Sequence, residues 1–449
     1  MKIKLLTPFF LLSIFFFSEC SKSDSSILPS EQDLVSLLES KSPNGSIEGL
    51  MLPASYNYSQ IPQDERNEIT KYKVELGKLL YNETALSINP QNIINYGTYS
   101  CASCHHSAAG FQSGLRQGIG EGGEGFGLKG EGRTRNKQCA EKEVDVQPLK
   151  SPSALNIAYQ TNVLWNGQFG ANGLNIGTQN QWTVGTPKAV NHLGYDGVET
   201  QAIAGFEVHR MGINLDLLKK EPYKSYFAKA FPAYGSIETI SHKKIIELIG
   251  LAIAAYERTL ISDLAPYQQW LRGSENALTD NQKEGMRLFF DKAQCYTCHN
   301  GPALNSMEFY ALGFGDLVGP EIIGDYNEEA NLGRGGFTKQ EKDNYKFKVP
   351  QLYNLKDAKF YGHGATFNSI EQVVMYFNKA EIQNSNVSNS KIAKEFKPLN
   401  LSEKEIEQLT DFLTNGLYDP DLQRYDPTYL PSGNCFPDND AVSKKQLCN

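Results

Sequence analysis

Apolar residues recur at helical spacing in several segments, whereas the alternating pattern of a half-buried strand is scarce. Over Lys71 to Tyr81, four apolar residues share a broad face, which predicts a helix: Val74, Leu76, Leu79 and Leu80. The segment from Ile245 to Ala255 is apolar almost all round and predicts a buried helix. The pattern therefore predicts a mainly α-helical protein with long connecting loops.

Two further helices are indicated by capping boxes. Thr279 to Gln282 has this form and predicts a helix that carries Met286, Leu288 and Phe289 towards a downstream Cys pair. Ser402 to Glu405 repeats the device before Ile406, Leu409 and Phe412, and Gly416 is expected to end that helix. Both helices belong to the second half of the chain.

The N-terminus is typical of an export signal. Lys2 and Lys4 precede an apolar run from Leu5 to Phe17 that is too short for a membrane span. Cys20 directly follows and resembles the lipidated Cys of bacterial lipoproteins, although Phe17-Ser18-Glu19 departs from the usual small residue before it. The alternative is a signal peptide cut elsewhere. We predict a signal over residues 1–20 and a protein of the periplasm or cell envelope, lipid-anchored.

The rest of the chain divides into two similar halves. Residues 21–65 are rich in Ser, Pro and Asn and are predicted to be a tether. Each half then shows a helix, a CxxCH motif, a long loop and further helices, which predicts domains over 66–275 and 276–420. A polar tail over 421–449 follows, in which Cys435 and Cys448 could close a disulfide loop. Cys139 has no obvious partner.

Composition narrows the class of protein. The 449 residues are 40% hydrophobic and 21% charged, as in soluble globular proteins. The formal charge of −8 argues against nucleic-acid binding, which normally needs a basic face. It suits contact with a basic protein partner.

Two CxxCH motifs carry the chemistry, Cys101-Ala-Ser-Cys104-His105 and Cys295-Tyr-Thr-Cys298-His299. Two thiols one helical turn apart can add to the vinyl groups of one haem, and the adjacent His then binds its iron. Zinc would need four closed ligands, and a thiol redox pair would not need the trailing His twice. The glycine run Gly118 to Gly123 lacks the strand and helix of a dinucleotide site. The motifs predict two covalently bound haems c, with His105 and His299 as iron ligands.

From about Val74 to Leu417 the chain resembles the bacterial dihaem cytochrome c peroxidases and the related enzymes that mature a tryptophylquinone cofactor. The resemblance rests on seven segments: Glu75–Tyr81 (ELGKLLY), Ser151–Asn156 (SPSALN), Trp165–Gly167 (WNG), Tyr256–Leu260 (YERTL), Cys295–Leu304 (CYTCHNGPAL), Phe347–Asn354 (FKVPQLYN) and Phe360–Gly364 (FYGHG). It implies two cytochrome c-like haem domains, a peroxide-reducing haem on His105, and a haem on His299 that takes electrons from a small donor protein, a cytochrome c or a cupredoxin.

The resemblance also implies residues around the first haem. A Trp matching Trp165 lies between the haems and aids electron passage, although Trp165 could also be a core aromatic. Gln201 matches a polar catalytic Gln, but the Glu expected ten residues later falls on Met211. Glu207 could then be the acid/base group, or His209 could act as base or as a sixth iron ligand. Either could also be an ordinary helix residue.

Around the second haem, His363 is implied to support the haem edge or simply to pack. A Met or Tyr ligand is implied about fourteen residues later, where Phe377 stands. Its neighbours Met375 and Tyr376 are the alternatives, and we favour Met375. The family also holds calcium between its domains, but Lys150 and Phe360 stand where we would look for its ligands, so calcium stays open.

The sequence thus favours a peroxidase that reduces hydrogen peroxide to water. An oxidase that modifies a partner protein is favoured if Tyr376 is the ligand, and a plain electron carrier if His209 closes the first iron. The membrane is contacted only through a lipid, and a homodimer is compatible with the sequence.

Overall fold

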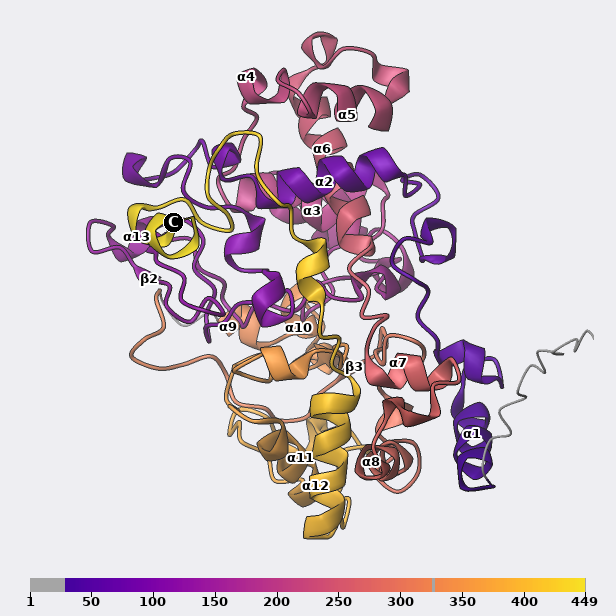
Figure 1. Ribbon diagram of the computed structural model, residues 1–449. Coiled ribbons are helices and arrows are strands. Elements are labelled where there is room, and N and C mark those ends of the chain that lie inside the picture. Colours follow the sequence, from indigo (N-terminus) through magenta and orange to yellow (C-terminus); the bar gives the residue numbers. More distant parts are fainter. Residues whose placement is uncertain (1–28, 325–327, 449) are drawn as a thin grey trace, which may run out of the picture.

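The computed structural model describes residues 29–324 and 328–448 (Figure 1). The predicted signal peptide, the lipidation candidate Cys20 and the start of the tether lie outside these ranges. Within them, helices predominate and the strands are short. No helix of the described ranges is long and apolar enough to cross a membrane.

The first half of the chain is built around three packed helices, α2 (Lys71–Asn82), α3 (Gly197–Val208) and α6 (His242–Arg258), with α4 (Leu215–Leu218) and α5 (Tyr223–Ala230) beyond them. A Cβ atom on Gly77 of α2 would collide with the carbonyl oxygen of Ala252 on α6, so the close approach of these helices requires glycine. The predicted helices over Lys71–Tyr81 and Ile245–Ala255 are confirmed.

The second half is built around α8 (Asp280–Phe290), α11 (Ile370–Lys379) and α12 (Glu403–Asp411), and α12 continues as a π-helical turn over Phe412–Gly416. Both predicted capping boxes form, with Thr279 and Ser402 as N-caps. The remaining elements are α7 (Pro266–Leu271), α9 (Glu328–Asn331), α10 (Arg334–Thr338) and two antiparallel pairs, β1 (Gly123–Glu124) with β2 (Thr134–Arg135) and β3 (Phe309–Tyr310) with β4 (Phe347–Lys348).

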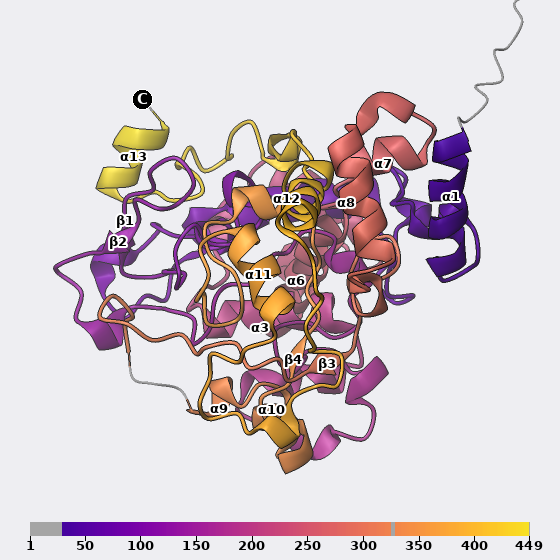
Figure 2. The same ribbon diagram turned by 90° about the horizontal axis from the view of Figure 1, so that it is seen from below.

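The predicted tether over residues 21–65 is corrected by the structure from residue 29 onwards. Helix α1 (Pro29–Lys41) lies beside α7 and α8 in both views (Figures 1 and 2). Leu34 and Leu38 are buried in the main core, and the carboxylate of Glu31 accepts a hydrogen bond from Trp270 Nε1 at 3.2 Å. Leucines at helical spacing thus outweigh the polar composition that suggested a tether.

The C-terminal segment is also part of the fold and returns to the first half. Helix α13 (Ala441–Leu447) lies beside β1 and β2 in both views (Figures 1 and 2). The buried guanidinium of Arg133 pairs with Asp438 at 2.9 Å and with Asp440 at 3.6 Å. Cys435 and Cys448 form the predicted disulfide, whereas Cys139 is buried and free. The segment is therefore anchored at several points.

The main hydrophobic cluster of the described residues contains side chains from both halves. It contains Tyr81 and Tyr256 from the first half, whose rings meet edge to face at 5.2 Å, and Phe289 and Phe412 from the second, at 5.8 Å. Because one core serves both halves, the loops between them are held in a fixed arrangement around the site.

Candidate functional site

A cavity of about 710 Å³ reaches both CxxCH motifs and is lined by all six of their Cys and His residues. Each motif begins with a single 3₁₀ turn, Cys101–Ser103 and Cys295–Thr297. Such a turn brings the two thiols of a motif to the same side of the chain. The structure therefore gathers the predicted haem-attachment residues of both halves around one space.

Both motif histidines are oriented by backbone carbonyls. His105 Nδ1 lies 3.3 Å from the carbonyl oxygen of Phe111, and His299 Nδ1 lies 3.1 and 3.0 Å from those of Leu304 and Pro350. Because a carbonyl oxygen only accepts, Nδ1 carries the proton and Nε2 keeps its lone pair for a metal. Burial lowers the pKa of each ring to about 4, so both are neutral at pH 7.

The thiols fit covalent attachment to a haem. Burial raises the pKa of Cys101 and of Cys295 to about 12 and also raises the pKa of Cys104 and Cys298. All four are therefore protonated at pH 7, and a thioether to a haem would form by net addition of each S–H across a vinyl group. Neutral imidazoles beside them match the iron ligand of a haem c.

Near the first motif, helix α3 and the residue that caps its C-terminus bring two predicted catalytic residues to the cavity, Gln201 and His209. His209 Nδ1 lies 2.7 Å from a carboxylate oxygen of Asp145, which also lines the cavity. Burial lowers the pKa of His209, but the charge and hydrogen bond of Asp145 outweigh it, so the pKa of His209 is raised above its usual 6.5. His209 is thus a basic imidazole with a fixed orientation.

Glu207 is not brought to the site. It lies on α3 but its side chain is exposed, and it does not line the cavity. The reason is helical geometry, since the face of α3 that carries Gln201, Ala204 and Gly205 looks into the cavity and Glu207 points away from it. The structure therefore corrects the expectation that Glu207 serves as the acid/base group.

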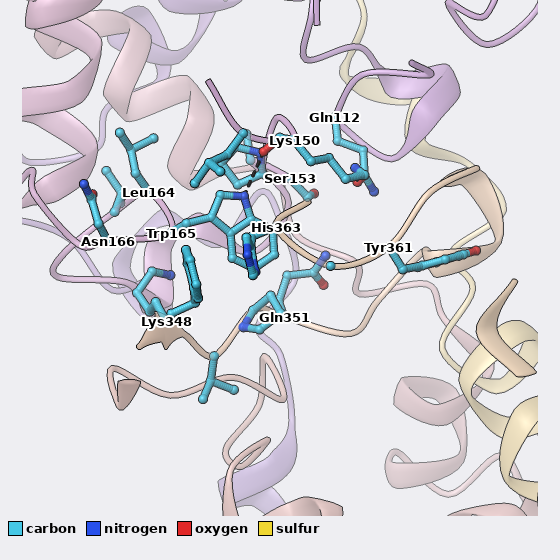
Figure 3. A pocket seen from close by; sticks show the side chains of 18 of the residues that line it. Gln112, Lys150, Ser153, Leu164, Trp165, Asn166, Lys348, Gln351, Tyr361 and His363 are labelled. Carbon is cyan, nitrogen blue, oxygen red and sulfur yellow. Dashed lines mark hydrogen bonds between the residues drawn. The ribbon is translucent and has the colours of Figure 1, made fainter. Parts of the chain in front are cut away.

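Trp165 and His363 lie at the junction of the halves (Figure 3). Trp165 Nε1 donates to the carbonyl oxygen of Lys150 at 2.8 Å, and the Trp165 carbonyl accepts from the backbone N–H of Lys348 at 2.8 Å. The ring of His363 is 6.3 Å from the indole and stacks at 3.5 Å on Phe347. Both predicted residues are therefore fixed between the motifs.

Near the second motif, α11 presents an apolar stripe to the cavity: Ile370, Val373, Val374 and Phe377. Met375 lies on another face, is 37% exposed and does not line the cavity. Tyr376 does not line it either, and its hydroxyl donates to the carbonyl oxygen of Leu312 at 2.6 Å. The structure thus corrects the choice of Met375 as an iron ligand.

The calcium site was left open by the sequence. The described residues contain no group of three or more His, Cys, Asp or Glu side chains placed to hold a metal ion. Lys150 and Phe360, which stand at the positions expected for its ligands, both line the cavity.

Three cavity residues were missed by the sequence reasoning: Asp145, Glu257 and Lys348. Asp145 is 64 residues from His209 and belongs to no motif, so no local signal pairs them. Burial raises the pKa of Glu257 to about 8, which makes it a neutral acid in the cavity wall. Lys348 was visible only as a polar residue inside the FKVPQLYN segment.

Comparison with known proteins identifies one matching family model and several similar proteins. A sequence model of the di-haem cytochrome c peroxidase family matches residues 71–276. The methylamine utilization protein MauG of Methylorubrum extorquens is 28% identical over 356 residues, which cover 79% of this chain and 80% of that protein. The cytochrome c peroxidase Ccp of Escherichia coli is 28% identical over 360 residues, 78% of this chain and 60% of that protein.

A solved structure shares the fold. The crystal structure of a MauG-like protein associated with microbial copper homeostasis aligns with a TM-score of 0.54 and 22% identity, over 83% of this chain and 95% of that one. At this identity the likeness establishes the fold alone.

Proposed function

Because the chain belongs to the di-haem cytochrome c peroxidase family, we propose that it reduces hydrogen peroxide to water with electrons from a small donor protein. The overall reaction consumes two electrons and two protons for each peroxide and releases two molecules of water. One haem c would be attached through Cys101 and Cys104, with His105 as the residue that would bind its iron, and a second through Cys295 and Cys298, with His299. When bound, these haems supply the redox-active iron.

One observation carries this proposal: a single cavity is lined by both CxxCH motifs and by a His–Asp pair on the side of the first motif. Peroxide reduction needs an iron, a route for electrons and a group that moves protons. The cavity holds residues suited to each of these tasks.

His209 is the proton-moving group of the proposed site. It would accept the proton of one peroxide oxygen and return it to the other, which then leaves as water; the remaining oxygen would become the second water after uptake of the two electrons and two protons of the overall reaction. Asp145 orients the imidazole at 2.7 Å and stabilises its protonated form. Gln201, on the helix that ends just before His209 and in the same cavity wall, provides a polar contact for the peroxide. Asp145 acts through His209 and is a positioning residue.

Trp165 provides the aromatic path between the motifs. Its indole N–H donates to the carbonyl oxygen of Lys150, and its own carbonyl oxygen accepts from the backbone N–H of Lys348. Both lysines line the cavity. Electrons enter on the side of His299, where the donor, a cytochrome c or a cupredoxin, docks. The formal charge of −8 favours a donor with a basic face.

The structure bears on the two alternative functions. Oxidation of a partner protein was favoured by a Tyr376 ligand, but this side chain does not line the cavity. A plain electron carrier requires His209 to bind the first iron permanently. Asp145 contacts Nδ1 of His209 and not Nε2, so this contact does not prevent Nε2 from binding iron. The optical spectrum of the half-reduced protein, which shows whether the first iron is six-coordinate, distinguishes the electron carrier from the peroxidase.

The test is rapid mixing of half-reduced holoprotein with hydrogen peroxide and reduced small cytochrome c. We expect fast donor oxidation in the wild type and none after Cys101→Ala with Cys104→Ala, which removes the first attachment site while leaving the second. Donor oxidation that persists in this variant would overturn the assigned roles. Two six-coordinate, unreactive haems in the wild type would establish an electron carrier instead.

The export signal supports a location in the periplasm or cell envelope, with lipidation at Cys20 as the proposed anchor. Mass spectrometry of the mature N-terminus, in the native host, tests both points. A free N-terminus beyond residue 20 would overturn the lipid anchor.

A further inference from the structure

Two lysine side chains are buried at the junction without an acidic partner. Lys150 is 3% and Lys348 is 6% exposed, and both line the cavity (Figure 3). The ammonium of Lys150 donates to Gln112 Oε1 and, at 3.4 Å, to the carbonyl oxygen of Ser151. The ammonium of Lys348 donates to Gln160 Oε1. Within the described ranges, neither ammonium forms an ion pair with a carboxylate.

A buried ammonium without a counter-charge is unfavourable, because neutral amides replace only part of the lost hydration. Burial accordingly lowers the pKa of both lysines to about 7, and no acidic group raises it again. If these two positions required only a neutral hydrogen-bonding side chain, Gln or Asn would serve without the cost of burying a charge. Two lysines in one cavity wall point to an anion that enters the cavity.

The two lysines are divided between the motifs. The ammonium of Lys150 donates to Gln112, whose backbone is paired with that of His106, the residue that directly follows His105. Lys348 lies on β4, two residues before Pro350, whose carbonyl oxygen holds His299 Nδ1 at 3.0 Å. Trp165 stands between them, bonded to the backbone of each. Trp165 therefore links the two lysine-bearing segments, through its indole N–H to Lys150 and through its own carbonyl oxygen to the N–H of Lys348.

We propose that Lys150 and Lys348 bind carboxylates, and that each forms an ion pair with a propionate of the haem attached on its own side. A haem carries two such carboxylates at one edge, which supplies the missing counter-charge. The inference rests on the haem attachment of the proposed function, and it is independent of the reaction with peroxide. Its consequence is electrostatic: a cation close to an iron stabilises the reduced state, which carries one positive charge fewer.

The experiment measures midpoint potentials of the resting holoprotein by spectroelectrochemistry, without peroxide. Lys150→Met should lower the reduction equilibrium constant of the His105 haem at least tenfold, about 59 mV for one electron. Lys348→Met should do the same for the His299 haem. Lys150→Arg and Lys348→Arg keep the charge and should stay close to the wild type. The matched controls Lys142→Met and Lys346→Met remove the same charge outside the cavity.

Equal potentials in the Met variants and the wild type would overturn the proposal, whether or not the protein turns over peroxide. If the Met variants do not accumulate with haem, a distance measurement on the wild-type protein still tests the proposal. Solid-state NMR on protein with ¹⁵Nζ-lysine and ¹³C-carboxyl-labelled haem, reduced and carbon monoxide-bound, should show a coupling typical of an ion pair of about 4 Å or less. Its absence at both lysines would equally overturn the proposal.

Discussion

The hydrogen bond between Asp145 and His209 gives a pH-dependent prediction. The substitution Asp145→Asn keeps the shape of the side chain and its acceptor oxygen but removes the charge. His209 works as a base only when it is neutral, so activity is lost as pH falls through its pKa. Asp145 raises that pKa above 6.5. In the variant the acid limb of the pH profile should therefore move to lower pH.

The size of this shift follows from the geometry. A hydrogen bond to a charged group contributes about 1.5–3 kcal/mol and a neutral one about 1 kcal/mol, so the charge accounts for about 1–2 kcal/mol. The two side chains are 29% and 12% exposed, which favours the lower part of that range. A loss of about 1–2 kcal/mol destabilises the protonated imidazole, so the pKa of His209 falls and the acid limb moves to lower pH. The plateau rate should fall as well, because a neutral amide stabilises the protonated imidazole less than a carboxylate does.

The assay is kcat/KM for hydrogen peroxide between pH 4.5 and 8 with a fixed donor. The comparison variant is Glu207→Gln, which removes a carboxylate two residues from His209 that does not line the cavity. Its profile should match the wild type. An unchanged profile in Asp145→Asn, or loss of the acid limb in Glu207→Gln, would refute the assignment of His209 as base.

Three stability predictions concern contacts that position the site. Arg258→Met should lower the free energy of unfolding by about 3–5 kcal/mol, because it leaves the buried Glu199 carboxylate without the guanidinium that now lies 2.6 Å from it. Urea unfolding measures this loss, and a value under about 1 kcal/mol would contradict the prediction. Gly77→Ala should destabilise by about 1–3 kcal/mol or more through the clash with the Ala252 carbonyl, whereas Gly205→Ala, in α3, replaces a glycine without a clash. Equal melting temperatures of the two variants would contradict this. Cys435→Ser with Cys448→Ser opens a disulfide loop with a sequence separation of 13 and should lower the free energy of unfolding by about 3 kcal/mol. A melting temperature of the wild type that does not change with reductant would contradict this prediction.

Most helices could be predicted because their signals are local. The stripe of α2, the all-apolar run of α6 and the capping boxes of α8 and α12 each lie within one segment. Helix α1 was hidden by polar residues around Leu34 and Leu38, whose burial depends on α7 and α8 from far along the chain. The return of α13 to β1 likewise depends on Arg133 meeting Asp438 across the fold, and no local pattern encodes that meeting.

The residues of the candidate site also separate into those with a local sequence signal and those without one. The CxxCH residues could be predicted because their chemistry is encoded in five consecutive positions. Asp145 could not, because its partner His209 is 64 residues away. The choices of Glu207 and Met375 failed on orientation: each lies within two residues of a cavity-lining side chain, and a helix turns about 100° per residue. Spacing placed the correct turn of helix at the cavity, but only packing decided which face looks inward.

The cavity wall itself indicates how the two sides divide the reaction. On the first side, His209, Asp145 and Gln201 offer groups that donate and accept protons. On the second, α11 contributes an apolar stripe, and the hydroxyl of Tyr376 donates to the carbonyl oxygen of Leu312. Peroxide reduction requires proton movement at the reacting oxygen atoms, whereas electron uptake from a donor requires none. The His–Asp pair therefore supports the proposal that peroxide reacts on the first side.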